Sequence, residues 1–303
     1  MSEVLDPQAL DPEAPVDALD EESPRRRSRG ATVLFDAPGP RARRRNRVIG
    51  VVGAAVILAA LAYVVVRFID TGQFAGKKWS ILEYKTVQQT LWNGYLGTLK
   101  AAAVAGVLAL ALGTLLAVGR LSDHRWLRGP AFALTELFRA IPLILLMFLF
   151  YYGLPTIGLR MTPFWAVVLA LTLYNGSVLA EIFRAGVASV PKGQREAGMA
   201  IGLRSGPVLR LILLPQAIRS MLPTVISQLV VLLKDTALGF LVTYDELLKQ
   251  IKQLATAPDF EFPLIPLALV GGAVYIATCF TLSRLAIFVE HRMRRGGKVA
   301  TGR

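Results

Sequence analysis

Long apolar stretches without charge recur along this chain, and they constrain its fold more than any other feature. The clearest is Val48–Val66, which contains no charged residue. A helix needs about 20 residues to cross a hydrocarbon core of about 30 Å, so this stretch predicts a membrane-spanning helix. A cleaved signal peptide is the alternative, but its apolar region has only about 7–15 residues and lies close to the N-terminus. This stretch is too long and begins too late for a signal peptide.

Five further stretches of similar length follow, each with few or no charges. We therefore predict an all-α integral membrane protein with six transmembrane helices, at Val48–Val66, Leu91–Val118, Ala131–Tyr152, Pro163–Ala180, Leu213–Leu233 and Leu264–Leu282. The fifth continues through Lys234–Val242. Gly94-x-x-Gly97 predicts a place where helices pack closely. Apolar residues at helical spacing in Tyr244–Leu254 predict a short amphipathic helix at the outer surface.

The basic charge of the chain is unevenly distributed. The chain has 34 Lys and Arg against 21 Asp and Glu, a formal charge of +13. With the N-terminus inside, the inner segments hold 23 Lys and Arg and the outer segments hold 7. The inner segments are 1–48, 119–130, 184–212 and 284–303, and the outer segments are 67–90, 153–162 and 243–263. Because positive residues favour the cytoplasmic side, we predict that both termini are cytoplasmic. This orientation accounts for the charge, so no nucleic-acid partner is expected.

Composition also separates two tails from the membrane domain. Residues 1–48 contain nine of the 21 acidic residues, then nine arginines, with prolines between them. Such a segment buries too little apolar surface to fold by itself. We predict a disordered, acidic-then-basic cytoplasmic tail at 1–48, a first transmembrane helix at 49–68, a transmembrane domain at 88–290 and a basic cytoplasmic tail at 291–303.

The inner loop at 184–212 is long and polar compared with the other connections. Within it, Glu196–Leu203 predicts a short helix rich in small residues, after which Ser205-Gly206-Pro207 is expected to break the helix. Small side chains would let the surface of a partner approach the backbone closely. A docking helix and a plain connecting loop are both consistent with this composition.

The spacing within this loop resembles the EAA loop of ABC importer permeases. That loop has Glu-Ala-Ala, a Gly six residues after the Glu, and Ile-x-Leu-Pro nine residues later. The chain has Glu196-Ala197-Gly198, then Gly202, then Ile212-Leu213-Leu214-Pro215. Gly198 replaces the usual Ala, a small-for-small change that weakens the helix by roughly 1 kcal/mol.

Other segments resemble the polar amino-acid subfamily of these permeases. They are residues 90–122, FRAIPLILLMFLFYYGL at 138–154, VPKGQ at 190–194 and LLKDT at 232–236. In the second, Ala140-Ile141 stands where Gly-Thr is more usual. The chain looks most like the glutamate/glutamine permeases of high-GC Gram-positive bacteria, and the resemblance covers about residues 90–290.

The resemblance implies a fold, a function and a set of partners. It implies the type I ABC importer permease fold, and import of a polar amino acid, glutamate or glutamine, by alternating access. The loop would couple to a dimer of separate ATPase subunits, which bind ATP and Mg²⁺, through Glu196, Ala197, Gly198, Ala200, Gly202 and Leu203. A second permease subunit, commonly a different chain, and an extracellular solute-binding protein would complete the complex in the bacterial plasma membrane.

Few charges lie at membrane depth, where an ionised residue costs roughly 2.5–3.5 kcal/mol. Lys234 and Asp235 are the deepest adjacent pair of charged residues. Their charges would either neutralise each other or contact the zwitterionic substrate. Glu181 and polar residues of the fourth span are further candidates, with roles in helix packing or in the path. The candidate residues for the substrate path are Arg139, Tyr174, Asn175, Lys234, Asp235 and Thr236.

Two other functional classes are less well supported by the sequence. An ion-coupled secondary transporter would carry coupling carboxylates within its spans, where Asp235 stands almost alone. The chain has no G-x-x-x-x-G-K-[ST] phosphate loop, so we expect no ATPase activity and no cofactor of its own. Cys/His metal spacing is also missing, because the chain has one Cys and two His, so no metal site is expected.

Overall fold

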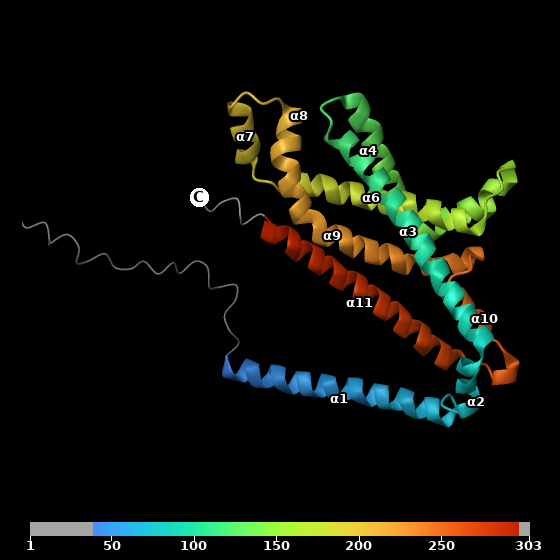
Figure 1. Ribbon diagram of the computed structural model, residues 1–303. Coiled ribbons are helices and arrows are strands. Elements are labelled where there is room, and N and C mark those ends of the chain that lie inside the picture. Colours follow the sequence, from blue (N-terminus) through green and yellow to red (C-terminus); the bar gives the residue numbers. More distant parts are fainter. Residues whose placement is uncertain (1–38, 297–303) are drawn as a thin grey trace, which may run out of the picture. The chain divides into compact units, whose positions relative to one another are not determined.

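The computed structural model describes residues 39–296, and all regular secondary structure in that range is helical. The chain divides into two compact units, Met1–Arg67 and Phe68–Arg303. Figure 1 shows their helices coloured along the sequence. The prediction of an all-α fold is confirmed for these residues.

The first unit holds most of α1, a 31-residue helix at Pro40–Asp70. α1 contains the predicted span Val48–Val66, and its apolar side chains are exposed along its length. The predicted tail is too long, because residues 40–48 are already helical. Proline is well tolerated in the first turn of a helix and arginine is a good helix former, which explains the earlier start. Residues 1–38 of the predicted tail lie outside the described residues.

The second unit contains long helices joined by shorter ones. The long helices are α3 (Lys85–Leu121), α6 (Pro163–Ala188), α9 (Leu214–Asp235) and α11 (Leu264–Gly296). The shorter ones are α2 (Gly76–Trp79), α4 (Arg125–Ala140), α5 (Leu143–Phe148), α7 (Lys192–Ala200), α8 (Ser205–Val208) and α10 (Leu247–Leu254). Tighter 3₁₀ or wider π segments lie at Ser80–Glu83, Leu149–Gly153, Leu154–Ile157, Leu209–Leu213, Thr236–Val242 and Pro258–Phe260. Residues 291–296, predicted as tail, continue α11, and residues 297–303 are not described.

Five of the predicted spans coincide with long apolar helical segments. Within residues 39–296 the segments able to cross a membrane are Pro40–Asp70, Lys85–Leu121, Pro163–Ala188, Ser205–Val242 and Leu264–Leu285. The fifth predicted span does continue to Val242, as a 3₁₀ segment after α9. These segments support the prediction of a multi-pass protein.

The predicted span at Ala131–Tyr152 is bent and is not one straight helix. The chain there forms α4 and a second helical segment that begins with α5, and the two are bent by 97°. The bend lies at Ile141-Pro142, where Ile141 has an extended backbone (φ −83°, ψ 124°). A residue before proline is pushed out of the helical region, so Pro142 explains the break. The region counts as a sixth span only if α4 and the segment that begins with α5 together cross the membrane once.

The core of the second unit is formed mainly by α3 and α6, which share the most extensive contact among these helices. On α3, the fully buried Ala101, Ala105 and Ala109 recur every four residues and therefore form one face of the helix. They belong to the same buried cluster as Val167 and Leu171 of α6. Small side chains on this face allow the close backbone packing on which membrane helices depend.

The predicted amphipathic segment forms α10, which packs closely against α3. The Tyr244 hydroxyl donates a hydrogen bond to the carbonyl oxygen of Gly97 at 2.8 Å. The backbone N–H of Leu247 donates to Thr98 Oγ1 at 3.2 Å. A Cβ atom at Gly97 would overlap the carbonyl oxygen of Asp245. The close packing predicted from Gly94-x-x-Gly97 is thus confirmed, and its partner is α10.

Glu246 fixes the start of α10 from a fully buried position. Its carboxylate accepts hydrogen bonds from the backbone N–H groups of Leu248 and Lys249, both at 2.7 Å. It also accepts one from the Tyr275 hydroxyl of α11 at 3.0 Å. Burial raises the pKa of Glu246 to about 7, although these hydrogen bonds oppose the rise. One carboxylate therefore caps α10 and connects it to α11.

We expect Gly97→Ala to destabilise the protein by about 1–3 kcal/mol, because the added methyl group collides with a backbone carbonyl that cannot rotate away. The matched control is Gly106→Ala on the same helix, where the nearest atom to the new Cβ is Leu229 Cδ2 at 3.6 Å. The control should be neutral or slightly stabilising, since alanine favours helix. The measurement is thermal unfolding in detergent, and an equal effect of the two substitutions would contradict the proposed packing.

We expect stability to fall as the pH rises from about 4.5 to about 7, between the unfolded and folded pKa values of Glu246. The pKa of this carboxyl is raised on folding from 4.5 to about 7, so the protonated form is favoured in the folded state. Its contribution, on the order of 2–3 kcal/mol, is complete below the unfolded pKa and is lost above the folded pKa. Unfolding temperatures measured against pH test this expectation. Glu246→Gln should flatten the slope, whereas substitution of the exposed Glu83 by Gln should preserve it.

Candidate functional site

The segment that resembles a coupling loop forms the short helix α7, Lys192–Ala200. It begins earlier than the predicted Glu196–Leu203, because the chain enters the helix directly after Pro191. At its end Gly202 has φ +86°, a left-handed conformation that glycine adopts without strain. There the N–H of Leu203 donates to the carbonyl oxygen of Gly198 at 3.2 Å, and the N–H of Gly202 donates to that of Met199 at 2.9 Å. These two bonds end the helix in a Schellman motif.

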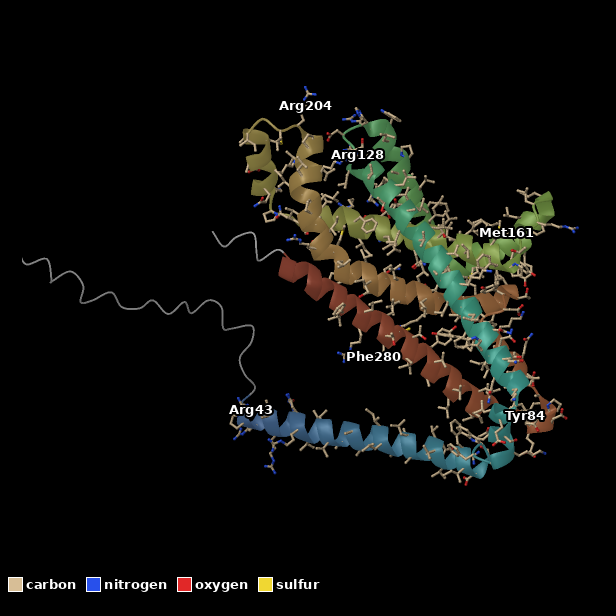
Figure 2. All side chains as sticks on the ribbon, viewed as in Figure 1. Arg43, Tyr84, Arg128, Met161, Arg204 and Phe280 are labelled. Atoms are coloured by element: carbon tan, nitrogen blue, oxygen red, sulfur yellow. The ribbon has the colours of Figure 1, made fainter. Side chains whose placement is uncertain are left out.

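The predicted break at Ser205-Gly206-Pro207 is misplaced. These residues lie in α8, the first turn of the next helix, and the interruption falls at 201–204. Proline is compatible with the first turn because the N–H it lacks would have no partner there. Figure 2 labels Arg204 in this interruption, at the tip of the projecting pair formed by α7 and α8.

α7 has a single buried residue, Gly198, and it is the residue that departs from the usual Ala. A Cβ atom at Gly198 would lie 2.7 Å from Ile212 Cδ1 and 3.0 Å from Val208 Cγ2. The small residue thus seats α7 on the helix that follows. The other residues of α7 are exposed, including Glu196, Ala197 and Ala200. Met199 and Ile201 add exposed apolar surface, so the outer face combines small, apolar and charged groups suited to docking.

A cluster of charges joins the ends of α3, α4 and α6. Arg120 Nη1 lies 3.0 Å from Glu181 Oε2 and 3.5 Å from Glu136 Oε1. Arg184 forms a bidentate ion pair with Glu181 one turn earlier on α6. Arg139 Nη1 lies 3.4 Å from Glu136 Oε1. Sequence reasoning singled out Arg139 and Glu181 but missed Arg120 and Glu136, because their partners come from other helices.

Arg139 also lines a cavity of about 430 Å³ between α6 and α9. Its other polar lining includes Glu181, Ser189, Ser220 and Thr224. The guanidinium and the hydroxyl groups can bind carboxylate or ammonium groups of a small ligand. Of the six residues predicted for the substrate path, Arg139 is the one that lines this cavity.

Asn175 is fully buried, and its side chain bridges two helices. Its Nδ2 donates to the carbonyl oxygen of Leu171 at 3.1 Å, and its Oδ1 accepts a hydrogen bond from Gln228 Nε2 of α9 at 2.8 Å. This arrangement favours the packing alternative for Asn175. Tyr174 is half-buried beside the main hydrophobic cluster, and its carbonyl oxygen accepts a hydrogen bond from the Ser177 hydroxyl.

The remaining predicted residues lie where α9 passes into the 3₁₀ segment Thr236–Val242. Lys234 is exposed, Asp235 is half-buried and Thr236 is fully buried. The Thr236 hydroxyl donates to the carbonyl oxygen of Leu233 at 2.7 Å. No ion pair between Lys234 and Asp235 is found among the described residues, so the two charges do not neutralise each other by direct contact. Within residues 39–296, no group of three His, Cys, Asp or Glu side chains is arranged to hold a metal ion.

Comparison with known proteins gives consistent matches. Residues 109–295 match the family described as binding-protein-dependent transport system inner membrane component. The glutamate transport system permease protein GluD of Corynebacterium glutamicum is 40% identical over 230 residues, covering 74% of this chain and 83% of GluD. The probable glutamine ABC transporter permease protein GlnM of Bacillus subtilis is 37% identical over 203 residues, covering 67% and 93% of the two chains.

Solved structures share the same fold. A crystal structure of an amino acid ABC transporter with histidines matches with a TM-score of 0.65 and 27% identity, covering 70% of this chain and 97% of that chain. An inward-facing structure of the MetNI methionine ABC transporter matches with a TM-score of 0.57 and 19% identity, covering 69% and 99% of the two chains. The second likeness concerns the fold alone.

We expect Gly198→Leu to detach α7 from the helix that follows, since the contact leaves no room for a large side chain. Gly198→Ala should be better tolerated than Gly198→Leu, because the nearest atom, Ile212 Cδ1, ends a side chain that can rotate away. Limited trypsin digestion reports the change locally, since Arg195 and Arg204 are exposed on and beside α7. Gly198→Leu should speed cleavage there by about 10-fold, the factor that about 1.4 kcal/mol of local destabilisation produces. Gly193→Ala, with open space around the new Cβ, is the control, and equal cleavage of all variants would contradict the packing role.

Proposed function

Because the chain belongs to the binding-protein-dependent transport system inner membrane component family, we propose that it imports glutamate or glutamine as the permease subunit of an ATP-driven transporter. Members of this family are multi-pass membrane permease subunits, not enzymes, and a separate subunit hydrolyses ATP. The observation that supports this function best is the exposed helix α7 with Glu196-Ala197 on its surface. Glutamate and glutamine are favoured as substrates because GluD and GlnM are among the most similar relatives.

The coupling step follows from the shape of α7. A short helix of exposed small residues can enter a groove on an ATPase subunit, with its backbone close to the groove wall. The docking face would consist of Glu196, Ala197 and Ala200, with the exposed apolar side chains of Met199 and Ile201 beside them. Gly198, Gly202 and Leu203 would fix the position of the helix. ATP-driven closure of two ATPase subunits would move α7, and with it α6 and α9, which flank the loop in sequence. The bound ATP and Mg²⁺ would belong to the ATPase.

The orientation and the remaining partners are part of the same proposal. The excess of Lys and Arg favours cytoplasmic termini and a cytoplasmic α7. An extracellular solute-binding protein would deliver the amino acid to the opposite face. Two glutamine permease relatives, GlnP and GlnM, come from one organism, Bacillus subtilis, which favours pairing of two different permease chains. Arg139 and the Lys234–Thr236 segment are the proposed contacts of the substrate path.

An ion-coupled secondary transporter is not supported by any of these comparisons. The matched relatives with a stated transporter class are ABC transporter subunits. Of the carboxylates at membrane depth, Glu181 is occupied by Arg120 and Arg184. A coupling carboxylate must be free to exchange its ion, so these ion pairs disfavour Glu181 as a coupling carboxylate.

We expect Glu196→Lys to abolish most coupling between transport and ATP hydrolysis. The exposed carboxylate becomes a cation at the docking face, and one mispaired charge at an interface reduces coupling by about 10-fold or more. The measurement is glutamate uptake into proteoliposomes that contain the chain with its ATPase, partner permease and binding protein, together with ATPase activity stimulated by the binding protein.

The matched control is Glu196→Asp, which keeps a carboxylate at the same position of α7. It should leave uptake and stimulated ATPase activity within about two-fold of wild type, since the charge at the docking face is preserved. Normal uptake by Glu196→Lys, in a complex that still contains the ATPase, would refute the coupling role of α7.

A further inference from the structure

Four arginines surround one pocket at the end of α3. The pocket has a volume of about 470 Å³ and is lined by Arg120, Arg125, Arg128, Gly129, Phe132 and Arg184. Arg120 comes from the last turn of α3 and is nearly buried, with 8% of its side chain exposed. Arg125 and Arg128 lie in the first turn of α4 and are exposed. The coupling role proposed for α7 uses none of these residues.

The charge around the pocket is not balanced within the chain. Glu181 and Glu136 neutralise part of it, since they pair with Arg120, Arg139 and Arg184. The short connection before α4 adds one more carboxylate, Asp123. Five arginines therefore face three carboxylates, and Arg125 and Arg128 are the two that form no ion pair among the described residues. An anion in the pocket would balance this excess.

The backbone adds to the attraction for an anion. α4 has 16 residues and begins at Arg125, beside the pocket. Its N-cap residue, His124, makes no side-chain hydrogen bond to the first turn. The free N–H groups of a helix start and its dipole both favour a negative group. Arginine guanidinium groups match the oxygens of a phosphate especially well.

The surroundings of the pocket indicate that the anion belongs to a lipid. Arg120 lies at the end of a membrane-spanning helix, where the hydrocarbon core gives way to headgroups. Trp126 is 72% exposed between Arg125 and Arg128, and Phe132 and Leu127 are exposed on the same helix. Aromatic residues beside arginines are characteristic of the membrane–water interface. Arg120 also stacks on Phe132, with its guanidinium carbon 5.2 Å from the ring centre.

From this arrangement we propose that the pocket binds the phosphate of an anionic phospholipid headgroup. Arg125 and Arg128 supply the charges that reach the headgroup, and the apolar side chains of α4 contact its acyl chains. Arg120 and Arg184 link the pocket to Glu181. Arg184 also lies near the end of α6, about one turn before the connection that leads to α7, so the bound lipid would stabilise the base of that connection. The proposal depends on membrane insertion and not on which amino acid is transported.

The test uses the complete transporter, purified in detergent and incubated with equal amounts of phosphatidylglycerol and phosphatidylcholine that carry the same acyl chains. Bound lipids are counted by native mass spectrometry. The wild-type protein should retain phosphatidylglycerol preferentially. In the double variant Arg125→Gln/Arg128→Gln, the ratio of bound phosphatidylglycerol to bound phosphatidylcholine should fall by about 10-fold, since both charges near the headgroup are removed. Arg125→Lys/Arg128→Lys should keep most of it.

The control is Lys85→Gln/Arg160→Gln, which removes two exposed charges outside the pocket. Figure 2 labels Tyr84, next to Lys85, at the opposite end of α3 from Arg128. This control should retain the wild-type preference. Size-exclusion chromatography and circular dichroism verify that each variant is assembled and helical.

Three results would overturn the proposal. The first is an unchanged phosphatidylglycerol preference in the assembled Arg125→Gln/Arg128→Gln variant. The second is loss of the preference when excess inorganic phosphate is added to the wild-type protein, which would identify a site for a soluble anion. The third is loss of the ATPase subunit from the double variant while the lipid preference persists, which would identify a protein interface. None of these results bears on the coupling role of Glu196.

Discussion

Close packing of small residues along α3 is the constraint on which the rest of the second unit depends. In a membrane, apolar side chains gain little by leaving lipid for protein, so helices associate where their backbones approach closely. Ala101, Ala105 and Ala109 make such an approach possible on the face that packs into the main core. Gly97 allows the same against the segment before α10. α3 therefore packs against α6 in the main core and, near its N-terminal end, against the segment before α10.

Charged side chains at the two ends of α3 are stabilised in different ways, by hydrogen bonds at one end and by ion pairs at the other. At one end Glu246 is buried and satisfied by three hydrogen-bond donors, so it acts as a cap for α10 and a tie to α11. At the other end Arg120, Glu136, Glu181 and Arg184 form an ion-pair network across three helices. The network joins the spans just before the loop that forms α7. The network therefore ties the end of α6, which precedes α7, to the ends of α3 and α4.

The sequence predicted the spans well and the exact helix limits less well. Charge-free stretches such as Val48–Val66 identify spans because hydrocarbon excludes charge along about 20 residues. Predictions from local sequence placed the helix limits incorrectly around Pro142 and Pro207. Pro142 breaks the predicted span Ala131–Tyr152, and Pro207 lies in the first turn of α8, where a break before the next helix was expected. In both cases the position of the proline relative to the first helical turn decides the outcome, and composition does not fix that position.

By itself, the sequence determined that this is an all-helical membrane protein, and it predicted a short helix of small residues in the loop at 184–212, because hydropathy and motif spacing are local properties. Only the tertiary structure decided which polar residues meet. Asn175 bonds to Gln228 across two helices, and Arg120 reaches Glu181 over 61 positions of sequence. The arginines around the end of α3 likewise come together from three helices. Such partners depend on how the helices rotate and cross, which is fixed by packing between segments far apart in the chain.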